Sequence, residues 1–331
     1  MSEFEENLAA VAGIFTDDAA DVDRSSSIPR SHFDHLAALG LYGAFAPIES
    51  GGLGLGLAQL CDVIEELASA CLATTFVWIQ HFRLLAAALD SNAPAIVGDL
   101  RREIVSGQVK GGVAVTGLQP GPAKLTATPA RGGWALDGEA PWVSGWGAVD
   151  LLVVAARGPD NTVVTVVLDA KDRPGLGVTR RHLSALNASA TVKLTFDALF
   201  VEEDNELERV PYDPSAERPE GLRVNGSLAL GVARRCCDVI GKSALDDDLR
   251  DARLELDRAD AKTIASARAH ACELAVRASH ALAVFLGSSS VIAGSVAERT
   301  AREAQVLLTF GSRPAIRQSL LVGFGLGKIE E

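Results

Sequence analysis

The 331-residue chain has few cysteines, and none has a spacing that indicates a structural or metal-binding role. The five thiols are Cys61, Cys71, Cys236, Cys237 and Cys272, and no Cys-x-x-Cys pair occurs among them. The spacing therefore indicates neither a disulfide framework nor a zinc site. We therefore expect buried apolar thiols in a reducing, cytoplasmic compartment.

Positive charge is also scarce: 31 Lys and Arg stand against 43 Asp and Glu, for a formal net charge of −12. A nucleic-acid-binding surface needs clustered Lys and Arg, so this balance argues against such a partner. Residues 1–10 are acidic and lack the basic start and apolar stretch of a secretory signal. Because no apolar run approaches the roughly 18 residues of a membrane-spanning helix, we expect no membrane span.

The motifs of several enzyme classes are absent. No Gly-x-Ser-x-Gly elbow, His-Glu-x-x-His or P-loop occurs, and the six histidines show no ligand spacing, so we expect no metal site. The glycine-rich run 51–56 is similar to a dinucleotide fingerprint, but a helical segment precedes it, and the acids that follow, Glu65 and Glu66, lie within a helical pattern. We interpret this run as a loop between helices, and His81 as an ordinary packed histidine.

The hydrophobic period changes twice along the chain. Apolar residues recur at helical spacing over 1–112, alternate with a period of two over 113–210, and return to helical spacing over 211–331. The runs 151–155 and 162–168 are typical of paired strands. The sequence therefore predicts an α+β protein: an N-terminal α-helical domain (1–112), a middle β-sheet, barrel-like domain (113–210) and a C-terminal α-helical bundle (211–331).

Two predicted strand ends in the middle domain carry residues suited to a flat heteroaromatic ring. Val115 and Thr116 end one apolar strand, and Trp142 with Ser144 ends another after a hairpin. An indole can cover one face of such a ring, while Thr and Ser hydroxyls can bond its polar edge. Trp and Ser in strands are also common as purely structural residues.

Four segments in this order resemble those of the acyl-CoA dehydrogenase family of flavoproteins. Segment 39–52 resembles the family's loop of Gly-Leu, Pro, Glu and Gly-Gly; 115–116 with 142–144 is similar to its two flavin-contacting strands; 183–201 resembles its Gly-x-Arg-x-Ser strand and exit; and 302–304, Arg-Glu-Ala, resembles the start of its closing helical segment. The resemblance spans nearly the whole chain.

The resemblance implies FAD held between the middle and C-terminal domains, with a CoA thioester against the flavin. It implies that Val115 and Thr116, with the backbone beside them, bond the pyrimidine edge of the flavin. It further implies that Trp142 packs on the ring and that Ser144 approaches N5. In that family a glutamate removes the α-proton of the thioester while the β-hydride passes to the flavin.

The resemblance also implies an oligomer, either of one chain or mixed. Gly287 and Ser288 match a glycine pair that lies near a neighbouring subunit's adenosine, and an electron-transfer flavoprotein or similar acceptor is the expected electron partner. The closing helices favour the same conclusion, because they carry more apolar residues than one short bundle readily buries. Examples are Leu274, Ala278, Leu282 and Phe285.

The chain departs from the family pattern at the catalytic base. The segment that matches the family's Glu-Gly-Thr element is 308–312, which places Phe310 or Gly311 where the glutamate belongs. Some members place the glutamate instead at the start of the first helix of the closing bundle, where Glu220 is the candidate. The alternative is that Glu220 is an exposed, solvated carboxylate.

Two further family segments are reduced or replaced. The Thr-Glu-Pro…Gly-Ser-Asp loop is shortened to 116–122, which bears on the pyrophosphate contacts, and 242–249 replaces the segment that reaches a neighbour's FAD.

Three functions follow as hypotheses. The first is FAD-dependent α,β-dehydrogenation of an acyl-CoA thioester in fatty acid or other lipid degradation, alone or in a hetero-oligomer. The second is a non-catalytic partner subunit of such a complex, and the third is a flavin-dependent monooxygenase of the same fold.

Overall fold

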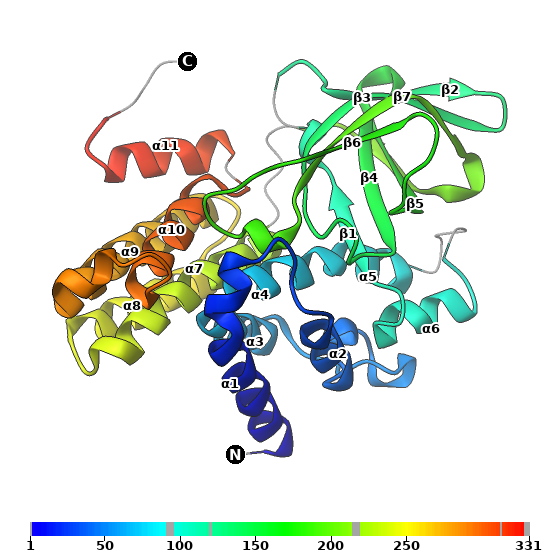
Figure 1. Ribbon diagram of the computed structural model, residues 1–331. Coiled ribbons are helices and arrows are strands. Elements are labelled where there is room, and N and C mark those ends of the chain that lie inside the picture. The colour runs from blue at the N-terminus through cyan, green and yellow to red at the C-terminus, as the bar shows by residue number, and fades with distance from the viewer. Residues whose placement is uncertain (1, 91–95, 119–120, 214–218, 312, 328–331) are drawn as a thin grey trace.

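The computed structural model describes residues 2–90, 96–118, 121–213, 219–311 and 313–327. Along this part of the chain, helices come first, strands follow, and helices return (Figure 1). This order confirms the predicted α+β fold class.

Among the described residues, six α-helices form the N-terminal part. Each buries one apolar stripe; in α1 the buried residues Leu8, Phe15 and Val22 lie on one face, and Ser2 begins the helix with a capping box. The helices are α1 (Glu3–Arg24), α2 (Arg30–Ala38), α3 (Leu57–Ala70), α4 (Leu72–Trp78), α5 (Phe82–Leu89) and α6 (Asp99–Ser106). The glycine-rich run 51–56 is a loop before α3, which confirms its interpretation.

The strands form one mixed sheet in the order β6-β7-β3-β2-β4-β5-β8, with β1 pairing in parallel with β4. The predicted strand pair is β4 and β5, which run antiparallel with Val153 opposite Val167. The strands are β1 (Gly111–Ala114), β2 (Leu125–Ala130), β3 (Gly133–Val143), β4 (Leu151–Arg157), β5 (Thr162–Asp169), β6 (Leu176–Arg180), β7 (Val192–Glu202) and β8 (Glu206–Pro211).

In the described part of the chain after the sheet there are five α-helices, with α9 at their centre. Leu274, Ala278 and Leu282 are buried because α9 packs against α7, α8, α10 and α11, so helices of the same chain cover these three members of the predicted apolar surface, and the oligomer stays a prediction. Phe285, near the end of α9, is 58% exposed. The helices are α7 (Pro219–Ile240), α8 (Ala244–Arg258), α9 (Ile264–Leu286), α10 (Val296–Thr309) and α11 (Pro314–Gly323).

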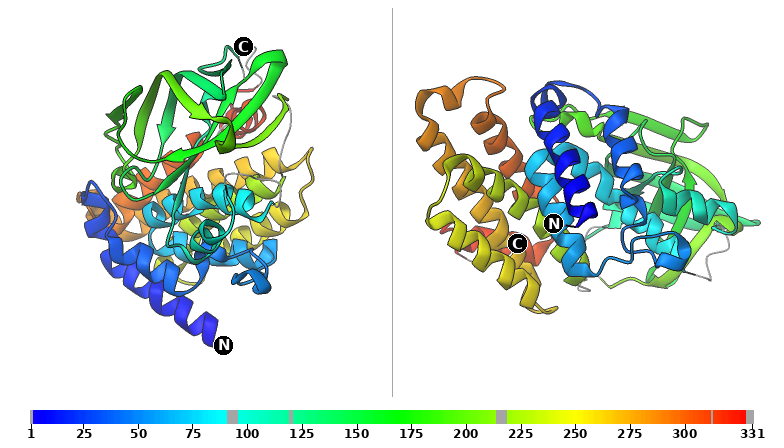
Figure 2. Two further views of the ribbon diagram at one scale, coloured as in Figure 1. Left: turned by 90° about the vertical axis from the view of Figure 1, so that its right-hand side faces the viewer. Right: turned by 90° about the horizontal axis from the view of Figure 1, so that it is seen from below.

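The sheet lies over the N-terminal helices, and the C-terminal helices lie beside them (Figures 1 and 2). Side chains of α5 and the sheet share a core, in which Leu84 and Leu85 join Val153 and Val167. The sheet has a second core of its own, and the two sets of helices share a third. All five cysteines are free and buried, as expected.

Two helical stretches are long and apolar enough to cross a membrane by length and composition alone. They are Leu72–Leu89, with 67% of its 18-residue window buried in the protein, and Ile264–Val291, with 33% buried. The expectation that no apolar run approaches this length is therefore wrong. Core helices meet the same criterion, which makes these stretches weak evidence for a membrane span.

Candidate functional site

The two predicted strand ends meet at one edge of the sheet. The hydroxyl of Thr116 accepts a hydrogen bond from the backbone N–H of Trp142 at 3.3 Å, and it can donate to the Trp142 carbonyl at 3.5 Å. These bonds tie the short turn after β1 to the end of β3. Trp142 is 50% exposed and Val115 is 36% exposed, so this edge presents an open indole beside hydroxyl and backbone groups.

Ser144 extends this edge toward β7. Its Oγ lies 2.8 Å from Thr191 Oγ1, which lies 2.8 Å from Ser189 Oγ, and in each pair either hydroxyl can be the donor. Thr191 and Ser189 are buried, whereas Ser144 is half-buried. The row of hydroxyls therefore leaves the outer one, on Ser144, with capacity to bond a group outside the protein.

A guanidinium completes the edge. Arg181 follows β6, and its guanidinium carbon lies 5.3 Å from the centre of the Trp142 ring, which is within cation–π range. Its Nε is buried and has no hydrogen-bond partner among the described residues. The sequence analysis did not single out Arg181, Thr191 or Ser189, because the pairing of β6 with β7 brings them to this site.

Val115, Thr116, Trp142 and Ser144 thus fit the ring of a flavin by the chemistry of their donors and by the exposed indole. Gly287 and Ser288 lie elsewhere, in the exposed turn between α9 and α10, which packs against those two helices. A single chain therefore does not show them at the sheet edge, and their contact with a neighbouring subunit's cofactor stays a prediction.

Neither predicted position for the base holds a buried carboxylate. Glu220 is exposed, at the second residue of α7. Phe310 follows α10, with its ring centre 4.6 Å from that of Phe76 at an interplanar angle of 71°, and its carbonyl accepts a 2.6 Å hydrogen bond from Arg268. A Cβ added to Gly311 would lie 3.7 Å from Asn225 Nδ2, so Gly311 lies beside α7.

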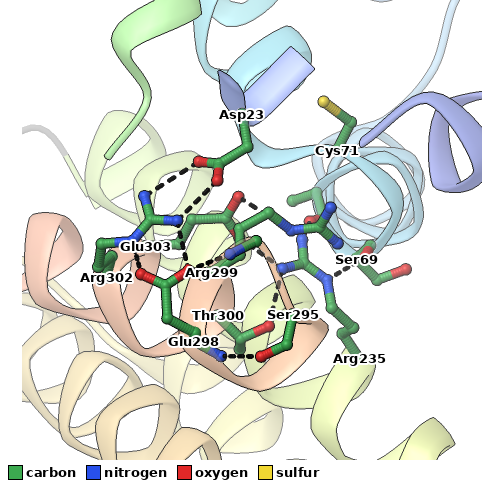
Figure 3. A network of polar contacts seen from close by, with 12 residues as sticks. Asp23, Ser69, Cys71, Arg235, Ser295, Glu298, Arg299, Thr300, Arg302 and Glu303 are labelled. Carbon is green, nitrogen blue, oxygen red and sulfur yellow. Dashed lines mark hydrogen bonds and ion pairs between the residues drawn. The ribbon is translucent and has the colours of Figure 1, made fainter. Parts of the chain in front are cut away.

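Arg302 and Glu303, from the family-like segment 302–304, are structural rather than exposed to a ligand (Figure 3). Arg302 pairs with Asp23 at 2.6 Å and with Glu298, and the two carboxylates raise the pKa of its guanidinium. Glu303 pairs with Arg235 of α7, which also donates to the carbonyl of Ser69 at 2.6 Å. The network therefore joins α10 to α1, α3 and α7.

His81 lies apart from these groups, between the N-terminal helices and β1. It is 1% exposed, its Nδ1 accepts a 2.9 Å hydrogen bond from the N–H of Gly111, and the Tyr42 ring meets it edge-on. Its Nε2 has no partner among the described residues. Burial first, and then the Lys110 cation, lower the pKa of His81 to about 3.

The described residues contain no group of three or more His, Cys, Asp or Glu side chains placed to hold a metal ion. The chemistry available at the sheet edge is therefore that of an indole, a guanidinium and a set of hydroxyls. These groups can bind a planar ring and a polar edge, and the charged group among them is the guanidinium of Arg181.

Comparison with known proteins agrees with this fold. Residues 5–94 match the family model "Acyl-CoA dehydrogenase, N-terminal domain". Benzylmalonyl-CoA dehydrogenase of Aromatoleum aromaticum is 30% identical over 232 residues, which cover 65% of this chain and 60% of that protein. L-evernosamine nitrososynthase of a Micromonospora strain is 32% identical over 236 residues, which cover 68% of this chain and 56% of that protein. The alignments thus span about 60% or less of these relatives' length.

The solved structure of butyryl-CoA dehydrogenase from Megasphaera elsdenii has the same fold, with a TM-score of 0.80 at 16% identity over 98% of both chains. The chain belongs to the acyl-CoA dehydrogenase family. FAD is the standard cofactor of that family, which confirms the expected cofactor class. Family membership alone does not define the reaction, since one of the two curated relatives is named a nitrososynthase.

Proposed function

We propose that this chain is one subunit of a flavin-dependent oxidoreductase that dehydrogenates the Cα–Cβ bond of an acyl-CoA thioester, and that the α-proton base comes from a partner chain. The single observation that carries this proposal is the contact of Phe310 with Phe76, since Phe310 and Gly311 are the two positions that match the family's glutamate. An apolar ring pair cannot accept a proton, and the alternative candidate, Glu220, is exposed.

The sheet edge supports the cofactor part of the proposal. Trp142 offers a flat apolar surface, and Thr116 is fixed by its two contacts with the Trp142 backbone. Ser144 is oriented from behind by Thr191 and can bond the polar edge of a ring lying on the indole. FAD bound here would supply the acceptor for the β-hydride. Every other task falls to side chains: holding the ring, excluding water and taking the α-proton.

The partner part of the proposal follows from the missing base and from the exposed end of α9. Val284, Phe285, Val291 and Ile292 are each more than half exposed, on and beside the turn that holds Gly287 and Ser288. An apolar surface of this kind is typical of subunit interfaces. A second acyl-CoA dehydrogenase chain, an electron-transfer flavoprotein or similar acceptor, and a cytoplasmic location belong to the same proposal.

The test is single-turnover flavin reduction by a panel of acyl-CoA thioesters, made first with this chain alone and then with the chain encoded beside it. We expect no bleaching by this chain alone and rapid bleaching by the pair. Glu220→Gln is expected to leave the rate for the pair unchanged, because the carboxylate is exposed. Rapid bleaching by the isolated chain that Glu220→Gln abolishes would overturn the assignment of the base to the partner.

A flavin-dependent oxygenation is the second candidate, favoured by the nitrososynthase relative and by the lack of a thioester base at Phe310. That reaction needs a reduced flavin, molecular oxygen and a bound acceptor substrate, but no α-proton base. Supplying the chain with reduced flavin under oxygen, and searching for an oxygenated product, separates it from the dehydrogenase. A flavin reduced by acyl-CoA in the absence of any other reductant supports dehydrogenation instead.

A further inference from the structure

Arg181 has no anionic partner among the described residues, although the chain carries a formal net charge of −12. The backbone N–H of Arg181 donates to the Thr191 carbonyl at 2.9 Å, which fixes its Cα beside the hydroxyl row. The guanidinium of its neighbour Arg180 donates hydrogen bonds to the carbonyls of Ser26 and Asn187. The guanidinium of Arg181 contacts the Trp142 ring and forms no ion pair among the described residues.

An unpaired, partly buried guanidinium is costly, because its N–H groups lose water without gaining acceptors. Nε of Arg181 is buried and unsatisfied, so an acceptor that reaches the Trp142 face would satisfy it. A guanidinium presents donors in a planar fork that matches two oxygens of a phosphate. The adjoining loop 116–122 contains no Lys or Arg that could bind an anion. The cation that contacts the indole is Arg181.

We propose that Arg181 binds a phosphate group of the ligand that lies on Trp142. The inference rests on the proposed function, which supplies two sources of that chemistry: the phosphates of a flavin nucleotide and the phosphates of an acyl-CoA. Arg181 is therefore a binding residue, and its effect belongs to affinity for phosphate-bearing ligands rather than for their uncharged parts.

The experiment measures dissociation constants by titration, using the chain in the assembly in which it purifies. One arm compares FAD with riboflavin, which lacks phosphate. The other compares an acyl-CoA with the N-acetylcysteamine thioester of the same acyl group, which also lacks phosphate. The variants are Arg181→Gln, which removes the charge, and Arg181→Lys, which keeps it. Arg131→Gln is the matched control, since Arg131 is an exposed cation beside the start of β3, about 30 Å from Trp142 at its other end.

We expect Arg181→Gln to weaken FAD or acyl-CoA about tenfold or more, because hydrogen bonds between charged groups are among the stronger ones. Riboflavin and the short thioester should change less than twofold, Arg181→Lys should recover part of the loss, and Arg131→Gln should change nothing. Loss in the FAD arm assigns the phosphate to the flavin nucleotide, and loss in the acyl-CoA arm assigns it to CoA; either supports the proposal.

Four results would overturn it. Equal weakening of the phosphate-bearing and phosphate-free ligands would show that Arg181 only supports the Trp142 ring. Unchanged affinity for all four ligands would show that it contacts none of them. If the wild-type protein binds riboflavin, but Arg181→Gln weakens FAD and acyl-CoA no more than the phosphate-free ligands, this inference alone is refuted. A wild-type protein that binds neither flavin nor thioester refutes the proposed function as well.

Discussion

Acid should destabilise this protein through the buried imidazole of His81. The pKa of His81 is lowered from 6.5 to about 3 in the folded chain, chiefly by burial. The unfolded chain therefore binds one more proton than the folded chain between these two values. Stability from neutral His81 is present above pH 6.5 and is lost as pH falls toward 3.

The size of the effect follows from the two pKa values. With 6.5 for the unfolded chain and about 3 for the folded one, linkage gives a loss of about 1.4 kcal/mol at pH 5.5 and about 2.7 kcal/mol at pH 4.5. Burial also lowers the pKa of His32, which Asp18 partly opposes, so His32 acts in the same direction. The contribution of His81 must therefore be measured as a difference between variants.

The assay is urea unfolding at pH 7.5, 6.5 and 5.5 for wild type, His81→Asn and Val77→Ala. Asn keeps an acceptor for the N–H of Gly111 but does not titrate, so its pH slope should be shallower than that of wild type by up to about 1.4 kcal/mol per pH unit. Val77 and His81 line one small cavity beside β1, and truncation of Val77 should lower stability equally at every pH. If His81→Asn keeps the wild-type slope, the reasoning about His81 is wrong.

Three further predictions concern the cofactor, the polar network and assembly. Trp142→Ala should weaken flavin binding about tenfold and alter the visible spectrum, since an aromatic contact is lost; an unchanged flavin content and spectrum would refute the assignment of this strand end. Arg302→Gln leaves two carboxylates without their cation and should cost about 3 kcal/mol of unfolding free energy, whereas Arg24→Gln, at an exposed pair, should cost less than about 1 kcal/mol; equal costs in urea unfolding would contradict the structural role of the network. Phe285→Ser should shift the chain toward monomer in light scattering, and a wild type that is already monomeric at micromolar concentration would contradict the interface.

The hydrophobic period of the sequence determined the fold class, because burial of one face imposes a period of two on strands and about 3.6 on helices. The strand pair β4 and β5 and the order of helices, sheet and helices follow from that period. The period also placed Thr116, Trp142 and Ser144 at predicted strand ends. The resemblance to the family's flavin-contacting strands then marked them as candidate site residues.

Only the tertiary structure decided which groups surround that motif. Arg181 and Thr191 reach Trp142 and Ser144 through the pairing of β6 with β7, and sequence spacing does not reveal that pairing. The apolar face of α9 shows the same limit. Its hydrophobic period predicts that Leu274 is buried. The structure shows that helices of the same chain bury it. Periodicity records that a side chain is buried, whereas the identity of its neighbours depends on contacts between distant segments.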